Sequence, residues 1–220
     1  EFTLQGPTLR FHSDALIALT GAACPASLDG EEVAYWQPVA VKAGQTLTLG
    51  RAQQGCRTCL AVRNGFDVPE YLGSRSTFAL GQFGGHAGRT LRVADMLPIS
   101  QPHLAACTTP APVSEPAALP AADRPVYGDE WRIGVLYGPH GAPDFFTAQS
   151  IDEFFAAEWQ VHYNSNRLGV RLVGPKPGWA RANGGEAGLH PSNVHDCEYA
   201  IGAVNFTGDF PVILTRDGPS

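Results

Sequence analysis

The sequence predicts a mainly β (α+β) protein with one clear helix, organised as two subdomains that an Ala/Pro-rich linker joins. Composition supports this fold class, because 25 glycines and 18 prolines among 220 residues favour short strands and turns over helical bundles. The hydrophobic pattern supports it too, since short apolar runs end at Gly, Asn-Gly or Pro without β–α–β alternation. Closed barrels or sandwiches therefore fit this chain better than a doubly wound sheet.

The first subdomain, residues 1–105, contains the first group of these apolar runs. We expect strands where turn residues bound each run, at 14–22, 45–50, 59–65 and 90–99. The segment VKAGQTLTLG (41–50) is typical of two strands that a tight turn joins. Because the sequence opens within a strand-like pattern, EFTLQGPTLRF, we expect this subdomain to be incomplete at its N-terminus.

The linker covers residues 106–129. Ala and Pro dominate this stretch, which has no hydrophobic periodicity, so a semi-extended connection is expected. Such a segment has little to bury, and we therefore expect residues 107–125 to be exposed and poorly packed.

The second subdomain, residues 130–220, contains the single strong helical signal. Apolar residues recur at helical spacing within SIDEFFAAEW (150–159), namely Ile151, Phe154, Phe155 and Trp159. Ser150 and Glu153 have the spacing of a capping box at its start. Strands are expected at 130–139, 159–164, 169–174, 198–206 and 210–216. The sequence ends without a closing element, so we expect this subdomain to be C-terminally incomplete.

Charge and cysteine content exclude several classes of partner. A net charge of −6 and a pI near 5.6 argue against nucleic acid or an anionic membrane surface as the main partner. No apolar run approaches the roughly 20 residues of a membrane span. The cysteines number 5, at irregular spacing, which is typical of reduced thiols in the cytoplasm.

Two groups of potential metal ligands lack the spacing of a metal site. Cys56 and Cys59 form a C-x-x-C pair, but no second pair completes it. The segment HPSNVHDCE brings together His190, His195, Asp196 and Glu198. Its H-x4-H spacing is not on a predicted helix, so we expect no metal and interpret these side chains as groups that orient an organic ligand.

The glycine-rich stretch 76–95 raises the question of an anion-binding loop. It does not end in Gly-Lys-Ser/Thr, so it is not a P-loop, and GQFGG does not match G-x-G-x-x-G. We expect an architectural loop whose glycines allow tight turns, with Arg75 and Arg89 paired inside the fold.

Asparagines recur in the second subdomain, at positions 164, 166, 183, 193 and 205. A carboxamide offers both a donor and an acceptor, which suits a small neutral amide-like substrate. Asparagine also tolerates turn conformations, and the sequence leaves both interpretations open.

Three long segments resemble a known family. CLAVRNGFDVPEYLGSRSTFALGQFGGHAGRTLRVAD (59–95) is similar to the biotin-dependent carboxyltransferase family, which includes the 5-oxoprolinase subunit proteins. WQVHYNSNRLGVRLVGPKPGWARANGGEAGLHPSNVHD (159–196) and AIGAVNFTGDFPVILTRDGPS (200–220) resemble, within it, the carboxyltransferase domains of urea carboxylases.

The resemblance implies cyclophilin-like β-barrel modules and the transfer of a carboxyl group from carboxybiotin to urea, which forms allophanate. It also implies partners outside this chain: a biotin carboxylase domain that uses ATP and Mg²⁺, a biotin carrier domain and a second carboxyltransferase module. The only methionine, Met96, is beside neither lysine, so no biotinylation site is present and the fragment is expected to be inactive alone. Two alternatives remain open: guanidine as the substrate, or a non-catalytic regulatory or binding module of the 5-oxoprolinase subunit type.

The resemblance also nominates site residues. Asn205 is the leading substrate contact, because the wider family carries glutamine where this sequence has that asparagine. Asn193 and Asn166 join it as catalytic candidates. The candidates for substrate binding are Arg167, His195, Asp196 and Asp209.

Overall fold

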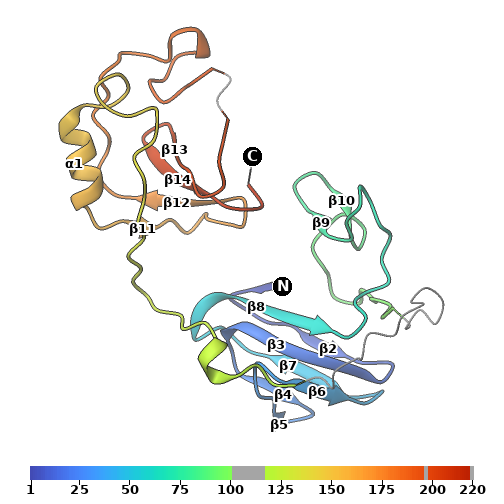
Figure 1. Cartoon of the computed structure of the whole chain (residues 1–220). Coiled ribbons are helices and arrows are strands. Elements are labelled where there is room, and N and C mark those ends of the chain that lie inside the picture. Colours follow the sequence, from blue (N-terminus) through green and yellow to red (C-terminus); the bar gives the residue numbers. More distant parts are fainter. Residues whose placement is uncertain (101–116, 196–197, 219–220) are drawn as a thin grey trace, which may run out of the picture. The chain divides into compact units, whose positions relative to one another are not determined.

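The computed structural model describes residues 1–100, 117–195 and 198–218, and it is mainly β with one α-helix, which confirms the predicted fold class (Figure 1). Contacts divide the chain into two compact units, Glu1–Arg132 and Ile133–Ser220. The subdomain limits and the cyclophilin-like topology stay predictions.

The first unit contains two four-stranded antiparallel sheets. One has the order β1-β8-β3-β6, with strands Phe2–Thr3, Gln54–Val62, Ala15–Ala23 and Pro38–Val41. The other has the order β2-β7-β4-β5, with strands Thr8–Arg10, Thr46–Leu49, Ala26–Leu28 and Glu31–Glu32. The strands expected at 14–22, 45–50 and 59–65 correspond to β3, β7 and the second half of β8.

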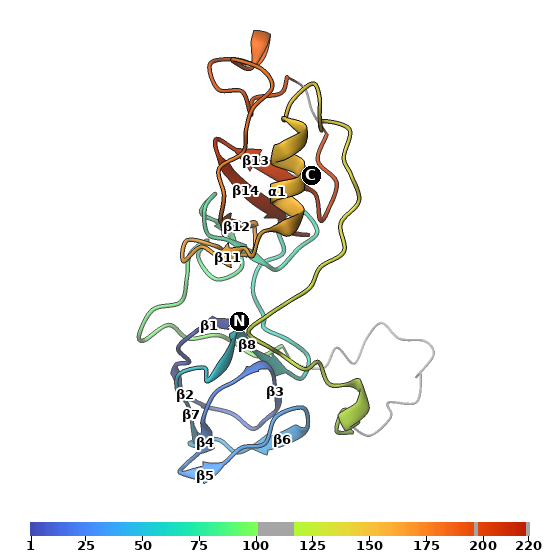
Figure 2. The same ribbon diagram turned by 90° about the vertical axis from the view of Figure 1, so that its left-hand side faces the viewer.

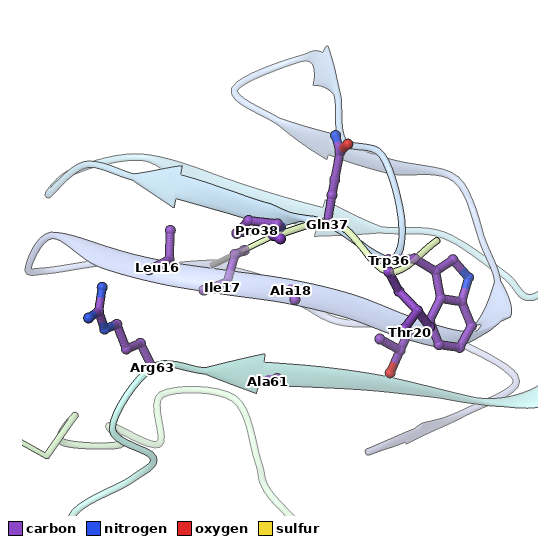
Figure 3. Close-up of a pocket in the computed structure, with 11 residues that line it drawn as sticks. Leu16, Ile17, Ala18, Thr20, Trp36, Gln37, Pro38, Ala61 and Arg63 are labelled. Atoms are coloured by element: carbon purple, nitrogen blue, oxygen red, sulfur yellow. The ribbon is translucent and has the colours of Figure 1, made fainter. Parts of the chain in front are cut away.

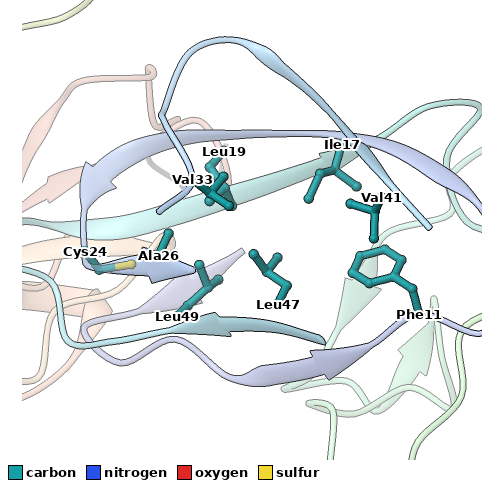
Figure 4. Close-up of a cluster of buried hydrophobic side chains, with 9 residues drawn as sticks. All are labelled: Phe11, Ile17, Leu19, Cys24, Ala26, Val33, Val41, Leu47 and Leu49. Carbon is teal, nitrogen blue, oxygen red and sulfur yellow. The ribbon is translucent and has the colours of Figure 1, made fainter. Parts of the chain in front are cut away.

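The core of this unit lies between the two sheets (Figure 4). Side chains alternate across a strand, so Ile17 and Leu19 on β3 point inward, as do Leu47 and Leu49 on β7. The complete buried cluster is Phe11, Ile17, Leu19, Cys24, Ala26, Val33, Val41, Leu47 and Leu49. The two layers therefore form a sandwich that buries apolar side chains from both sheets.

Residues 41–50 follow the expected order of strand, turn and strand, from the end of β6 to β7. A turn between Lys42 and Gln45 does separate two strands, with Gln45 N donating to Lys42 O at 3.1 Å. The strand β6 pairs with β3, while β7 pairs with β2 and β4. The two strands therefore belong to different sheets, and this turn connects the two layers of the sandwich, whose apolar side chains share one core.

Two expected strands do not form. Residues 90–99 are mostly irregular, with a turn at 93–94, and contribute a single bridge, between Ile99 and Phe66. Residues 130–139 belong to no strand or bridge, and all are exposed. A strand needs a neighbouring ladder for its backbone groups, and the described residues supply none to either segment.

The glycine-rich loop forms a short hairpin, β9 (Thr77–Phe78) with β10 (Phe83–Gly84). Gly84 has φ +74°, and a Cβ there would lie 2.3 Å from Ser76 O, so the backbone requires glycine. Arg89 is paired as expected, since its Nη1 and Nη2 donate to Asp95 at 2.7 and 2.8 Å. This bidentate bond lowers the pKa of Asp95. Arg75, in contrast, lies at the surface, with Nη1 3.5 Å from Phe66 O.

The described part of the predicted linker, 117–129, is mostly exposed and includes a 3₁₀ turn at Ala121–Asp123. Its backbone is hydrogen-bonded to the strand region of the same unit where Leu119 N donates to Trp36 O at 2.8 Å. Residues 106–116 of the linker lie outside the described residues.

The second unit has one antiparallel sheet of order β11-β12-β14-β13, with α1 along one face (Figure 2). The strands are Gln160–Val161, Gly169–Val173, Phe210–Leu214 and Val204–Thr207. A 3₁₀ turn occupies Gly185–Ala187. The strands expected at 159–164, 169–174, 198–206 and 210–216 all contribute to this sheet.

The helix α1 spans Ala148–Ala156 and begins earlier than expected. Thr147 is its N-cap, with Oγ1 accepting from Ser150 N at 3.2 Å. Ser150 itself is buried, and its Oγ accepts from Gly178 N at 3.0 Å, so the predicted capping box is wrong. Phe155 is 54% exposed, and Trp159 lies beyond the helix end, so neither belongs to a buried helix face.

Candidate functional site

The two faces of the second unit's sheet have different chemistry. Phe206 on β13 packs against aromatic rings, with centroids 4.8 Å from Phe146 and 6.1 Å from Phe154 of α1. Because side chains alternate along a strand, Asn205 lies on the opposite face. We call this opposite face, which carries Asn205, Arg171, Val212 and Phe210, the open face.

The strand register aligns three residues of the open face in one row. Val212 on β14 pairs with Asn205 on one side and with Arg171 of β12 on the other. The Arg171 guanidinium carbon lies 5.5 Å from the centroid of the Phe210 ring. Asn205 is half-buried, and within the described residues its carboxamide has no hydrogen-bond partner. A carboxamide in this position is available to a ligand.

Asp209 forms a separate cluster at the turn between β13 and β14. Its Oδ1 accepts from Trp179 Nε1 at 3.1 Å, while Lys176 Nζ lies 3.6 Å from Oδ2 and His190 Nε2 lies 3.5 Å from Oδ1. The indole hydrogen bond, followed by the charges of Lys176 and His190, lowers the pKa of Asp209. Asp209 is therefore an ionised carboxylate that three groups of its own unit hold.

Hydrogen bonds fix the loop beside this carboxylate. His190 Nδ1 accepts from Ser192 N at 3.1 Å and lies 2.9 Å from Ser192 Oγ, and that Oγ accepts from Gly208 N at 3.1 Å. These bonds connect residues 190–192 to the Gly208–Asp209 turn.

Asn193 belongs to this loop through its backbone. Its N–H donates to His190 O at 2.9 Å, and its carbonyl accepts from Arg181 Nη2. The Asn193 side chain is exposed. His195 is exposed as well, and Asp196 lies outside the described residues.

Asn166 and Arg167 lie at the other end of the sheet. Asn166 Oδ1 accepts from Leu168 N at 2.8 Å, which is an Asx turn before β12. Arg167 Nε donates to Asp217 at 2.6 Å. Since β12 begins at Gly169, opposite Leu214, while Asp209 precedes the first residue of β14, about 17 Å of strand separates the two groups.

The predicted site residues thus occupy three places on one sheet. Asn205 is central, Asp209 and Asn193 are near one end, and Asn166 and Arg167 are near the other. Their assignment as catalytic and binding groups stays a prediction. Arg171 is not among the residues predicted from the sequence, although one signal for it was present: it is a single cation within the apolar run GVRLVG.

A groove of about 440 Å³ lies on the first unit (Figure 3). Its lining is mostly apolar and includes Leu16, Ala18, Thr20, Trp36, Pro38, Ala61, Arg63 and Leu119. None of the predicted site residues lines it. Among the described residues, no three His, Cys, Asp or Glu side chains gather as metal ligands. No described helix is long and apolar enough to span a bilayer.

Comparison with known proteins identifies the family. The sequence matches the family "Carboxyltransferase domain, subdomain A and B" over residues 1–220, so the chain belongs to this family and the resemblance noted from its motifs is confirmed. It is 55% identical over 222 residues to the urea amidolyase of Lachancea kluyveri, covering 100% of this chain and 12% of that protein.

Solved structures and a bacterial relative agree with this membership. The crystal structure of Kluyveromyces lactis urea carboxylase matches with a TM-score of 0.90 at 52% identity, covering 100% of this chain and 20% of that one. A 5-oxoprolinase subunit of Escherichia coli is 38% identical over 174 residues, covering 79% of this chain and 52% of that protein.

Proposed function

We propose that this chain forms part of the carboxyltransferase site of a urea carboxylase, in which a carboxyl group moves from carboxybiotin to a urea nitrogen to give allophanate. The identity with the fungal urea amidolyase over the whole chain supports the choice of urea. In this proposal the chain acts in the cytoplasm within a longer polypeptide, as a ligase component that is inactive alone. The biotin carrier domain, the ATP- and Mg²⁺-using biotin carboxylase domain and the second carboxyltransferase module lie outside it.

The residues of this chain fit a carboxylated cofactor that is delivered to them from elsewhere. Both lysines have acidic neighbours, Lys42 with Asp14 at 2.9 Å and Lys176 with Asp209 at 3.6 Å, and neither is flanked by methionine. The open face offers a guanidinium and a carboxamide, which match a carboxylate and a ureido group. When bound, the cofactor supplies the activated carboxyl group.

The observation that carries the proposal is the half-buried Asn205 carboxamide, which lacks a partner among the described residues. Its N–H₂ can donate to the urea oxygen while its carbonyl oxygen accepts from a urea N–H. Strand pairing on β13 fixes the backbone at this position, with Asn205 opposite Val212. A group held this way orients the urea nitrogen toward the carboxyl carbon without reorganisation during the reaction.

The test is Asn205→Ala in the complete enzyme. Loss of this contact should cost roughly 2–4 kcal/mol of transition-state stabilisation, about a hundredfold in urea-dependent turnover. Biotin carboxylation by the upstream domain and the melting temperature should not change. Asn183→Ala is the matched control, because the exposed Asn183 uses its Oδ1 only in a turn, accepting from Gly185 N at 2.9 Å. If turnover persists in Asn205→Ala, or falls together with the melting temperature, Asn205 is structural.

Charge on the open face supports urea over guanidine as the acceptor in this proposal. Guanidinium is a cation that would need a carboxylate, whereas the row beside Asn205 contains Arg171 and Val212. The row therefore favours a neutral acceptor. Comparing turnover with urea and with guanidine in the same preparation tests this choice.

The relationship to the bacterial 5-oxoprolinase subunit supports a second candidate, a binding or regulatory module without carboxyl transfer. Such a module has no need for an unpartnered amide in a half-buried position. Carboxybiotin-dependent turnover of the complete polypeptide separates the two candidates, since only the carboxyltransferase consumes carboxybiotin when urea is added.

A further inference from the structure

Arg171 is a half-buried arginine that the fold does not use. It lies in the interior of β12, and among the described residues its guanidinium makes no hydrogen bond or ion pair, only the contact with the Phe210 ring at 5.5 Å. Arg181, also half-buried, is different: its guanidinium stacks on Phe145 at 4.2 Å, and its Nε donates to Pro191 O at 2.7 Å. Keeping a guanidinium partly out of water without a partner is costly, so Arg171 requires an explanation.

The position of Arg171 on the sheet indicates which other residue a bound ligand would contact. Arg171 and Asn205 flank Val212 on the open face, and two strand spacings place their Cα atoms about 10 Å apart. Both side chains can therefore reach one small ligand above Val212. The Phe210 ring restrains the guanidinium by a cation–π contact, which reduces the freedom lost on binding.

We infer that Arg171 anchors the carboxylate of the group being transferred, while Asn205 holds the acceptor amide. This inference rests on the proposed function and deepens it. A planar guanidinium binds a carboxylate through two parallel hydrogen bonds, a geometry that an ammonium group cannot provide. Of the small molecules in the reaction, the carboxyl donor and the product allophanate carry a carboxylate, and urea does not.

The step balances without a further reactant. The urea nitrogen forms a bond to the carboxyl carbon, and the bond between that carbon and the ureido nitrogen of the donor breaks. The electron pair of the broken bond stays on the ureido group, which takes up the proton that the urea nitrogen loses. Arg171 holds the carboxylate oxygens before and after the transfer, so it should contribute to turnover and to product binding but little to urea binding.

The test uses Arg171→Gln and Arg171→Lys in the complete enzyme, with allophanate as the probe. Arg171→Gln should lower kcat by about a hundredfold and weaken inhibition by allophanate at least about tenfold, while the KM for urea changes less than about threefold. Arg171→Lys keeps the positive charge but loses the two parallel N–H donors of the guanidinium. Allophanate should therefore inhibit it more strongly than Arg171→Gln but less strongly than the wild type. Arg216→Gln, which changes an exposed arginine of the same unit, should leave all three quantities unchanged.

Two outcomes overturn the inference: normal kcat and allophanate inhibition in Arg171→Gln, or a parallel rise in the KM for urea. If Arg171→Gln does not fold, the test depends on Arg171→Lys. The inference is also overturned if that variant has the wild-type melting temperature, kcat and inhibition by allophanate. If the wild-type enzyme binds allophanate through Arg171 but does not carboxylate urea, the proposed function is refuted. The role of Arg171 as a carboxylate-binding residue is then still supported. The two failures are therefore distinguishable.

Discussion

The two units of this chain use their sheets differently. In the first unit, two sheets face each other and bury apolar side chains from both, among them Leu19 and Leu47 at 0% exposure. In the second unit, α1 and aromatic residues cover one face of a single sheet, and the other face carries Arg171 and Asn205. Because side chains alternate between the two faces of a strand, the first unit buries the inward side chains of both sheets. The second unit instead presents polar side chains on the open face of its sheet. We therefore expect substitutions in the first unit to act mainly on stability and substitutions on the open face to act mainly on turnover.

The largest effect on stability should come from Leu47→Ala on β7. Removing a fully buried leucine side chain leaves a cavity, so the free energy of unfolding should fall by about 3–5 kcal/mol. Leu80→Ala is the control, because Leu80 is 77% exposed and should change stability by less than about 0.5 kcal/mol. Denaturant unfolding, with hydrogen exchange to assign the loss to the first unit, measures both. Equal effects at the two positions would show that the core of the sandwich does not dominate the stability of this unit.

Strands formed by an apolar run between turn residues were predictable from the sequence. For β3, β7 and β14, apolar residues and bounding turns indicated both the element and its limits within a few residues. Pairing was not predictable in the same way. The pattern in 41–50 indicates two strands but not that they belong to different sheets, and residues 130–139 have strand-like residues without a partner among the described residues.

The candidate site was predictable only in part, for a related reason. Asn205 was nominated only through the family resemblance, because the wider family carries glutamine at this position. Arg171 was not nominated, because a single arginine in a strand usually lies at the surface, and only the register with Val212 shows that it shares a row with Asn205. Asn166 was predicted as a site residue, but its side chain already forms a local hydrogen bond in an Asx turn, which by itself accounts for an asparagine at this position.

The next effect concerns the glycine-rich hairpin. Gly84 and Gly73 share a φ of +74°, but a Cβ at Gly84 would lie 2.3 Å from Ser76 O, while one at Gly73 meets nothing within 4 Å. Gly84→Ala should therefore destabilise the protein by about 1–3 kcal/mol more than Gly73→Ala, since only the first adds a backbone collision to the unfavourable φ. Thermal melting of both variants measures the difference. In the complete enzyme, the KM for urea should not change in either variant. A large rise in KM at unchanged melting temperature would identify a ligand loop.

A smaller effect is expected at the start of α1. Thr147→Ala removes the side-chain acceptor for Ser150 N and should cost about 1 kcal/mol of stability. Thr147→Ser keeps the hydroxyl and should retain most of it. Circular dichroism melts measure both variants. Equal losses in the two would show that the Thr147 methyl group, rather than the cap, stabilises this end of the helix.

The smallest effect is a pH dependence at Asp209, which lies next to the open face and tests whether this turn is structural. The Trp179 hydrogen bond, together with the charges of Lys176 and His190, lowers the pKa of Asp209 below the ordinary value of 3.8. A carboxylate with a lowered folded-state pKa contributes stability above its unfolded pKa and loses it as the pH falls through the folded value. Wild-type stability should therefore decline more steeply than that of Asp209→Asn as the pH is lowered from about 5 to about 3. Urea unfolding at several pH values measures the two slopes. Parallel slopes would mean that the three contacts do not stabilise the ionised carboxylate, and Asp209 would then be free to serve a ligand in the complete enzyme.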